Sequence, residues 1–175
     1  MNSANDGILI VYTGDGKGKT TAALGLVFRA LGRKLPVAVV QFVKGGWETG
    51  EQLLSEGLVG LDFEALGEGF TWQGADPERH SRAAQVAWVR AKGLLSGGKH
   101  RVVVLDELTH AILQGFVSCE EVLAGVAARA LGTTVVVTGQ YAPAPLMDAA
   151  DLVTEMRAVK HPFTRGLKAI PGIDY

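Results

Sequence analysis

Short runs of aliphatic and β-branched residues recur along the chain, and several of them are apolar at consecutive positions. Strands with one solvated face alternate apolar and polar residues, whereas continuous apolar runs are typical of strands buried on both faces of a parallel sheet. The pattern therefore predicts an α/β protein with a mainly parallel sheet. The expected strands, about six, are residues 8–12, 37–43, 61–65, 102–105, 133–138 and 152–159.

Helical patterns fill the gaps between these runs. One covers residues 19–31 and stops before a glycine. Another covers residues 77–95, and Asp76 directly before it is the candidate N-cap. A third, 118–131, opens with a capping box. Alternating strands and helices predict right-handed crossovers and a ligand site beyond the carboxyl ends of the strands. No repeat or linker divides the chain, so we expect a single domain over residues 1–175.

Composition narrows the class of protein. The 175 residues are 47% hydrophobic and 20% charged, which excludes a disordered chain. With 17 Lys and Arg against 18 Asp and Glu, no net field favours a nucleic acid or an anionic membrane. The single cysteine, Cys119, excludes an intrachain disulfide and a Cys-rich metal cluster. Because we find neither a secretory signal nor an apolar run near the roughly 20 residues of a spanning helix, we expect a cytoplasmic protein.

A glycine-rich loop follows the first expected strand directly. Residues 13–20 read Thr-Gly-Asp-Gly-Lys-Gly-Lys-Thr, which matches the Walker A pattern except that Thr13 replaces its first glycine. The glycines let successive N–H groups converge on phosphate oxygens, and the following helix adds its positive end. Lys17 and Lys19 supply charge for the phosphates, and the Thr20 hydroxyl is suited to Mg²⁺. The residues expected to bind the nucleotide are Gly14, Asp15, Gly16, Lys17, Gly18, Lys19, Thr20 and Thr21.

The alternative for this loop is a glycine-rich turn without a ligand. A strand before the loop and a helix after it are the context that the phosphate-binding motif requires. We therefore favour a nucleotide site.

Two carboxylates end a second apolar strand. Residues 102–105 are Val-Val-Val-Leu, and Asp106 and Glu107 follow, which is the form of a Walker B segment. Near a phosphate loop, one carboxylate can hold Mg²⁺ while the other orients its neighbours or acts as a base. The alternative is an exposed pair that favours a helix N-terminus. Beside the phosphate loop we favour the metal site, with Thr20 and Glu107 as the expected Mg²⁺ ligands.

These motifs and several further segments resemble the P-loop ATP:corrinoid adenosyltransferases over about residues 7–175. The further segments are 40–45, 50–51, 69–72, 103–109, 159–161 and 172–175. The resemblance implies a P-loop NTPase-like (RecA-like) domain that transfers the 5′-deoxyadenosyl group of ATP to the cobalt of a reduced corrinoid. Tripolyphosphate is then the leaving group, and the loop lysines and Mg²⁺ stabilise its charge. A homodimer and a flavoprotein reductant are further implications of the resemblance.

The resemblance also implies that an aromatic pair displaces the lower axial ligand of the corrinoid, which makes the cobalt easier to reduce. The matching residues are Phe70 and Trp72. Positions two apart in an extended segment face the same side, so both rings can press on one face of a flat macrocycle. Without the resemblance, two rings packed in the core would be the simpler interpretation. Phe70, Trp72 and Lys19 form the expected catalytic set.

The sequence departs from the family pattern in two places. Only residues 1–6 precede the first strand, where many members carry a helix that caps the corrinoid, and Gln140 stands where the family often has arginine. Arg157, Lys160 and Arg165 are the candidates for supplying that charge, although each suits a solvated surface equally well.

Other P-loop functions remain as alternatives. An ATPase in which Glu107 activates water is the main rival, and a bare nucleotide-binding module is a weaker one. A GTPase is disfavoured because no asparagine follows Asn5 to form an Asn-Lys-x-Asp segment. A kinase would need an acceptor site, and the sequence indicates none.

Overall fold

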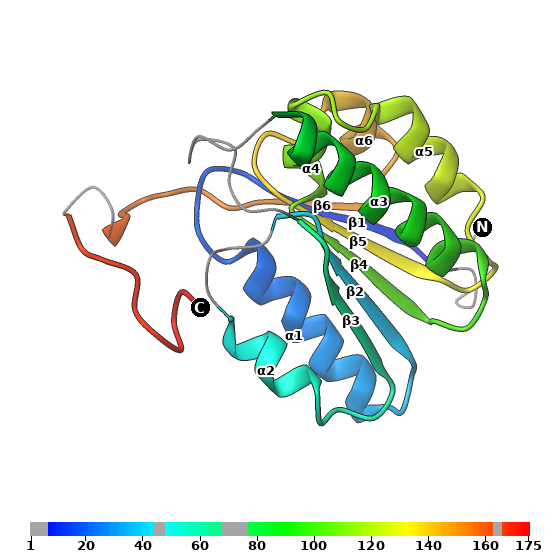
Figure 1. Ribbon diagram of the computed structural model, residues 1–175, viewed down its shortest axis with the longest axis horizontal. Helices are drawn as coiled ribbons and strands as arrows, with labels where there is room; N and C mark the ends of the chain where they lie inside the picture. The colour runs from blue at the N-terminus through cyan, green and yellow to red at the C-terminus, as the bar shows by residue number, and fades with distance from the viewer. Residues whose placement is uncertain (1–6, 44–47, 68–76, 163–165) are drawn as a thin grey trace.

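Six parallel strands form one sheet at the centre of the protein, in the order β3-β2-β4-β5-β1-β6 (Figure 1). The computed structural model describes residues 7–43, 48–67, 77–162 and 166–175. The strands are β1 Leu9–Thr13, β2 Val37–Gln41, β3 Leu61–Ala65, β4 Val102–Asp106, β5 Thr134–Thr138 and β6 Leu152–Glu155. This arrangement confirms the predicted α/β, P-loop NTPase-like fold.

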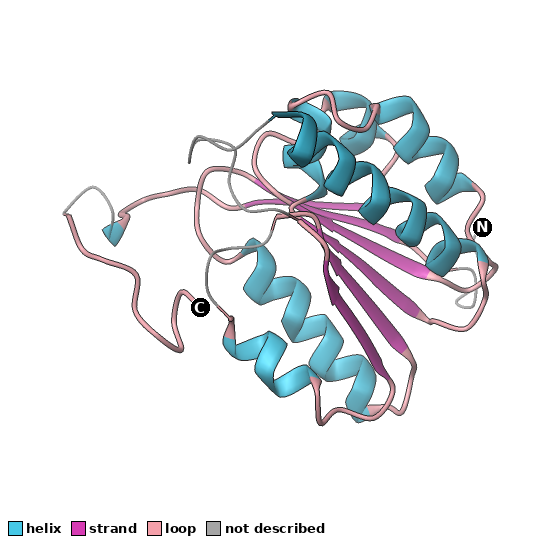
Figure 2. Ribbon diagram, in the orientation of Figure 1, coloured by secondary structure: helices cyan, strands magenta, loops and turns pink. Residues whose placement is uncertain are grey.

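Helices cover both faces of the sheet (Figure 2). They are α1 Lys19–Gly32, α2 Gly50–Ser55, α3 Pro77–Ser96, α4 Leu108–Leu113, α5 Cys119–Ala127 and α6 Ala144–Asp148. Helices α1 and α2 lie on one face, and the other helices lie on the opposite face. No helix in the described residues is both long and apolar enough to cross a membrane.

Each central strand contributes side chains to two hydrophobic cores, one on each face of the sheet, because successive side chains point to opposite faces. Leu9 and Val11 of β1 join the core under α3 and α5, where Trp88 is the largest buried side chain, whereas Ile10 joins the core under α1. Burial on both faces explains the continuous apolar runs of the sequence.

Three predicted elements end earlier in the structure. Helix α5 ends at Ala127 rather than at residue 131, and the Arg129 side chain donates to the carbonyl oxygens of Val126 and Thr133 just beyond it. The prediction for β2 was two residues too long. Strand β6 ends at Glu155 rather than at residue 159, because β1, the strand it pairs with, ends there and becomes the phosphate loop.

Helices α2 and α6 were not predicted. Each is at most six residues long, which is too short for a helical period to stand out. The predicted capping box at Ser118 and Glu121 is confirmed, since each side chain accepts a hydrogen bond from the other residue's backbone N–H. The proposed N-cap Asp76 lies outside the described residues.

The register of the sheet brings polar residues to one edge. Gln41 pairs with Asp106 across β2 and β4, and Tyr12 pairs with Thr138 across β1 and β5. The carboxyl ends of parallel strands lie at the same edge, so the residues that follow β1, β4 and β5 meet there.

Candidate active site

The phosphate loop joins β1 to α1 through glycines with positive φ. Gly14 has a φ of 99° and Gly18 a φ of 114°, values that strain any other residue. A Cβ atom on Gly14 would lie 2.2 Å from the carbonyl oxygen of Met156. The N–H of Gly16 donates to the same oxygen at 2.7 Å. The loop is therefore packed against the chain that follows β6.

The Lys19 side chain lies inside this loop and is buried. Its Nζ donates to the carbonyl oxygens of Gly14 at 2.9 Å and Gly16 at 2.7 Å. Burial lowers the pKa of the Lys19 amine, and nearby carboxylates, with Glu107 the strongest, oppose that shift. A phosphate would offer the amine charged acceptors in place of neutral carbonyls, and charge-assisted hydrogen bonds are the stronger kind.

Asp106 is buried at the end of β4 and accepts hydrogen bonds from three other elements. Its Oδ1 accepts from Thr20 Oγ1 of α1 at 2.9 Å and from Thr138 Oγ1 of β5 at 2.7 Å. Its Oδ2 accepts from Gln41 Nε2 of β2 at 3.2 Å. Burial raises the pKa of Asp106, and these hydrogen bonds oppose the shift. The carboxylate therefore fixes the Thr20 hydroxyl relative to the sheet.

Glu107 lies one residue further on, in a left-handed backbone conformation with a φ of 57°. Its N–H donates to Thr138 Oγ1 at 2.9 Å. Burial, together with the charge of Asp106, raises the pKa of Glu107 to about 7, although Lys19 opposes the shift. Within the described part of the chain, its carboxylate accepts no hydrogen bond. It is thus a partly buried acid that lacks a sufficient counter-charge.

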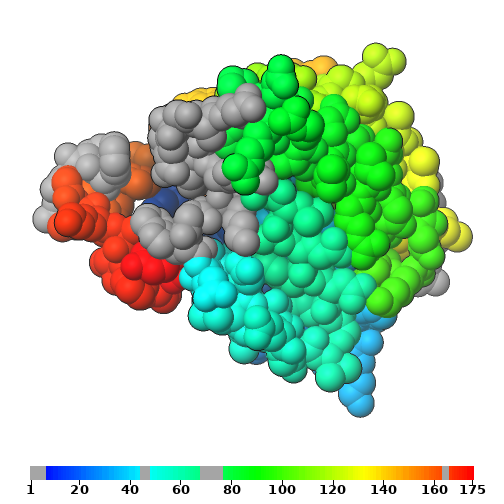
Figure 3. All heavy atoms as spheres, viewed as in Figure 1, coloured from blue at the N-terminus to red at the C-terminus, as the bar shows by residue number. Residues whose placement is uncertain are grey.

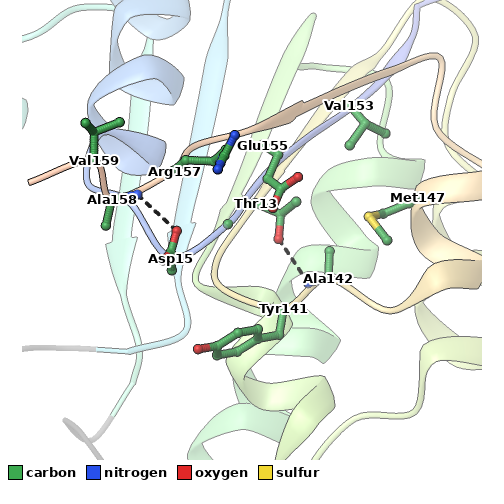
Figure 4. A pocket seen from close by; sticks show the side chains of 11 residues that line it. Thr13, Asp15, Tyr141, Ala142, Met147, Val153, Glu155, Arg157, Ala158 and Val159 are labelled. Atoms are coloured by element: carbon green, nitrogen blue, oxygen red, sulfur yellow. Dashed lines mark hydrogen bonds between the residues drawn. The ribbon is translucent and has the colours of Figure 1, made fainter.

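A cavity of about 530 Å³ opens beside the loop, at the carboxyl ends of β1, β5 and β6 (Figure 4). Thr13 Oγ1 accepts a hydrogen bond from the N–H of Ala142 at 3.0 Å, and Asp15 Oδ1 accepts one from Ala158 at 3.1 Å. Tyr141 lines the same cavity with a φ of 52°. These bonds tie the segments after β5 and β6 to the phosphate loop, so three loops line one cavity.

Known proteins match this chain over nearly its whole length. The family model described as ATP:corrinoid adenosyltransferase BtuR/CobO/CobP matches residues 5–175. The chain belongs to this family. The corrinoid adenosyltransferase CobA of Salmonella typhimurium is 44% identical over 169 residues, which are 97% of this chain and 86% of that protein. The corrinoid adenosyltransferases of Escherichia coli and Pseudomonas aeruginosa are each 43% identical, cover 97% of this chain, and are covered over 86% and 84% of their own lengths.

The acidic site of this family member fits a divalent cation. Thr20 and Glu107 offer the oxygen ligands that Mg²⁺ prefers, and a cation would supply the counter-charge that Glu107 lacks. Among the described residues no group of three or more His, Cys, Asp or Glu side chains could hold a metal ion. Mg²⁺ commonly combines one or two protein ligands with phosphate oxygens of a nucleotide, so this donor set suits a metal that arrives with ATP.

The structure brings together most of the predicted site residues of the adenosyltransferase. Residues 14–21 form the loop and the start of α1, and Glu107 directly follows β4, close enough to affect the pKa of Lys19. Phe70, Trp72 and Arg165 lie outside the described residues. Arg157 lines the cavity beside the loop, and within the described chain it makes no ion pair. Lys160 is exposed.

Two site residues, Gln41 and Thr138, received no role from the sequence. Both hold Asp106, and both are polar residues that end an apolar strand of a parallel sheet. Their position at the carboxyl end of a strand could have indicated a role in the site, because ligands of such sheets bind beyond that edge. Which carboxylate they would meet depended on the strand order.

Proposed function

We propose that this chain transfers the 5′-deoxyadenosyl group of ATP to the cobalt of a reduced corrinoid and releases tripolyphosphate. The observation that most strongly supports this proposal is the family match over residues 5–175, in a chain whose phosphate loop has positive φ at Gly14 and Gly18. Cobalt(I) attacks the 5′ carbon, a cobalt–carbon bond forms, and the carbon–oxygen bond to the triphosphate breaks. The two electrons of the new bond come from cobalt, which becomes cobalt(III), while the leaving oxygen keeps the electron pair of the broken bond.

The phosphate loop stabilises the leaving group in this reaction. Negative charge develops on tripolyphosphate as the bond breaks, and preorganised N–H groups and cations lower the energy of that charge. The positive φ of Gly14 and Gly18 allows the loop to present N–H groups to the phosphates, and Lys17 and Lys19 supply the positive charge. Because cobalt is the nucleophile, the proposed step requires no general base from the protein.

Thr20 and Glu107 are the proposed protein ligands of Mg²⁺. When bound, the cation would neutralise part of the phosphate charge. Asp106 holds the Thr20 hydroxyl through its Oδ1, and the Glu107 backbone is held by Thr138. Asp106 thus acts as a positioning residue, since all three donors around it leave little capacity for a further ligand.

Phe70 and Trp72 are the proposed corrinoid contacts. The described residues that lead into their segment support this assignment, because the N–H groups of Leu66 and Gly67 both donate to the carbonyl oxygen of Gln41, at 3.1 and 3.2 Å. Gln41 also contacts Asp106. Leu66 and Gly67 therefore lie at the carboxyl-end edge of the sheet, beside the acidic site.

The wider setting follows from the same family assignment. We propose a single-domain cytoplasmic enzyme that works as a homodimer and receives electrons for the corrinoid from a flavoprotein. The reducing compartment is supported by the one free cysteine, Cys119, which is partly buried against the core under α3 and α5.

A product assay tests the proposed function. The purified chain is incubated with ATP, Mg²⁺ and chemically reduced cobalamin, and adenosylcobalamin and tripolyphosphate are expected in equal amounts. Orthophosphate without a corrinoid product would contradict the proposal and favour the ATPase alternative, in which Glu107 activates water. Lys19→Ala should weaken ATP binding and abolish most product formation. The matched control is Lys92→Ala, which removes an exposed lysine of α3.

A further inference from the structure

The C-terminal segment, residues 166–175, returns to the phosphate loop. The Nζ of Lys17 forms an ion pair with Oδ1 of Asp174, 157 positions later in the chain. The Lys17 side chain is 47% exposed and the Asp174 side chain 18% exposed. In Figure 3 the red C-terminal residues lie against the cyan α2 region, and both border one cavity.

Asp174 also forms hydrogen bonds within the C-terminal segment. Its Oδ2 accepts a hydrogen bond from the N–H of Ile170 at 2.8 Å, and its own N–H donates to the Ile170 carbonyl oxygen at 2.8 Å. The hydrogen bond from Lys17, followed by that from Ile170, lowers the pKa of Asp174. The carboxylate is therefore an anion at neutral pH, held in a turn that presents it to a lysine of the phosphate loop.

The same segment forms one wall of a second cavity, of about 560 Å³. The other walls come from α1, α2 and β3, with Leu24, Phe28, Leu54 and Phe63 among the apolar side chains. Ile173 belongs to the C-terminal wall and is 72% exposed. A displacement of the C-terminal segment would therefore change the shape of a mostly apolar cavity that begins at Thr20 and Thr21.

We infer that Asp174 competes with the triphosphate of ATP for Lys17, and that nucleotide binding releases the C-terminal segment from the phosphate loop. The inference rests on the proposed function, since it takes ATP as the ligand. An ion pair whose lysine side chain is about half exposed is weak. A triphosphate offers Lys17 several charged oxygens, and the N–H groups of the loop and the start of α1 attract the same anion.

Once Lys17 turns to phosphate, Asp174 is left close to a polyanion without its cation. Like charges at short range repel each other, so the carboxylate and the turn around Ile170 move away from the loop. In the opposite arrangement, Asp174 would hold Lys17 in place for the phosphate and would strengthen binding. When the carboxylate is neutralised, the affinity for ATP should rise if Asp174 competes for Lys17 and fall if Asp174 holds Lys17 in place.

Asp174→Asn separates these arrangements by calorimetric titration with ATP and, independently, with tripolyphosphate. We expect both ligands to bind about two- to fivefold more tightly than to the wild-type chain. The matched control is Asp148→Asn, which removes the same charge from the exposed end of α6 and should leave the affinities within error. In a Lys17→Gln background, where Asp174 has no lysine to withhold from the phosphates, Asp174→Asn should have a much smaller effect, limited to like-charge repulsion.

Weaker or unchanged binding by Asp174→Asn would overturn the inference, as would an effect of undiminished size in the Lys17→Gln background. If the wild-type chain binds neither ATP nor tripolyphosphate, the proposed function fails as well, so the two failures are distinguishable. Hydrogen exchange gives a second measurement. The amides of Gly172 and Asp174, both bonded within the segment, should exchange faster when tripolyphosphate is bound, and slower exchange would contradict release.

Discussion

Thr20 and Asp106 lie 86 residues apart in the chain and are joined by a hydrogen bond of 2.9 Å from the threonine hydroxyl to the carboxylate. The bond links the first turn of α1 to the end of β4, with β5 between β4 and β1 in the sheet. Because Asp106 is buried and also accepts from Gln41 and Thr138, it behaves as a fixed anchor. The Thr20 hydroxyl is thereby oriented before any ligand arrives.

Asp106→Asn tests whether this anchor serves the metal site. The amide keeps the size of the carboxylate but replaces an acceptor with a donor, so one of its three partners loses its bond. We expect about a tenfold to hundredfold loss in apparent Mg²⁺ affinity in the ATP-dependent reaction, measured as activity against Mg²⁺ concentration. Asp148→Asn is the control. An unaltered Mg²⁺ dependence with a lower melting temperature would show that Asp106 is only structural.

Gly139→Ala tests the packing between the segments after β4 and β5. The φ of Gly139 is 135°, and a Cβ atom there would lie 2.1 Å from Thr109 Oγ1 and 3.2 Å from Glu107 Oε2. We expect a loss of about 1–3 kcal/mol in the free energy of unfolding, together with lower activity as Glu107 is displaced. Chemical denaturation measures the first effect and the product assay the second.

The control for this substitution is Gly93→Ala in α3, where a Cβ atom would meet nothing within 4 Å. Alanine is the better helix former, so a gain of about 0.5–1 kcal/mol is expected there. Equal stability of the two variants would contradict the close contact at Gly139.

Phe70→Ala separates nucleotide binding from corrinoid activation. We expect the Mg-ATP affinity to be retained, because the phosphate loop is intact, and most of the activity to be lost when cob(II)alamin must be reduced on the enzyme. Activity with cob(I)alamin prepared beforehand should fall much less. Calorimetry and the product assay with each corrinoid check this. A parallel loss of ATP binding would show that Phe70 is structural.

Asp62 of β3 should make stability depend on pH. The Nζ of Lys99 and the Nε2 of His100 each lie 2.7 Å from its Oδ2, and the Lys99 hydrogen bond, followed by that of His100, lowers the pKa of Asp62. A carboxyl with a lowered folded-state pKa stabilises the fold above its unfolded pKa, about 3.9, and this contribution disappears as pH falls through the folded pKa.

The difference in unfolding free energy between the wild-type chain and Asp62→Asn should therefore shrink as pH falls below about 4. Denaturant titrations across a pH series measure it. A difference that stays constant down to the acid limit would mean that the substitution acts through packing rather than through charge.

Local patterns predicted much of this fold because their causes are local. The glycines of the phosphate loop allow its positive φ angles without help from the rest of the chain. The capping box at Ser118 likewise involves only the first turn of its own helix. Continuous apolar runs indicated strands that are buried on both faces of the sheet. The same reasoning failed for the end of β6, since where that strand stops depends on where β1, its neighbour, turns away.

The sequence by itself determined a phosphate loop, a second acidic strand end and a parallel α/β class, because glycine spacing and hydrophobic period act over a few residues. Only the tertiary structure decided that Gln41, Thr138 and Thr20 converge on Asp106, and that Asp174 reaches Lys17. Those contacts join residues that lie far apart in the chain. They depend on strand order, register and the path of the last residues, which are set by packing across the whole domain.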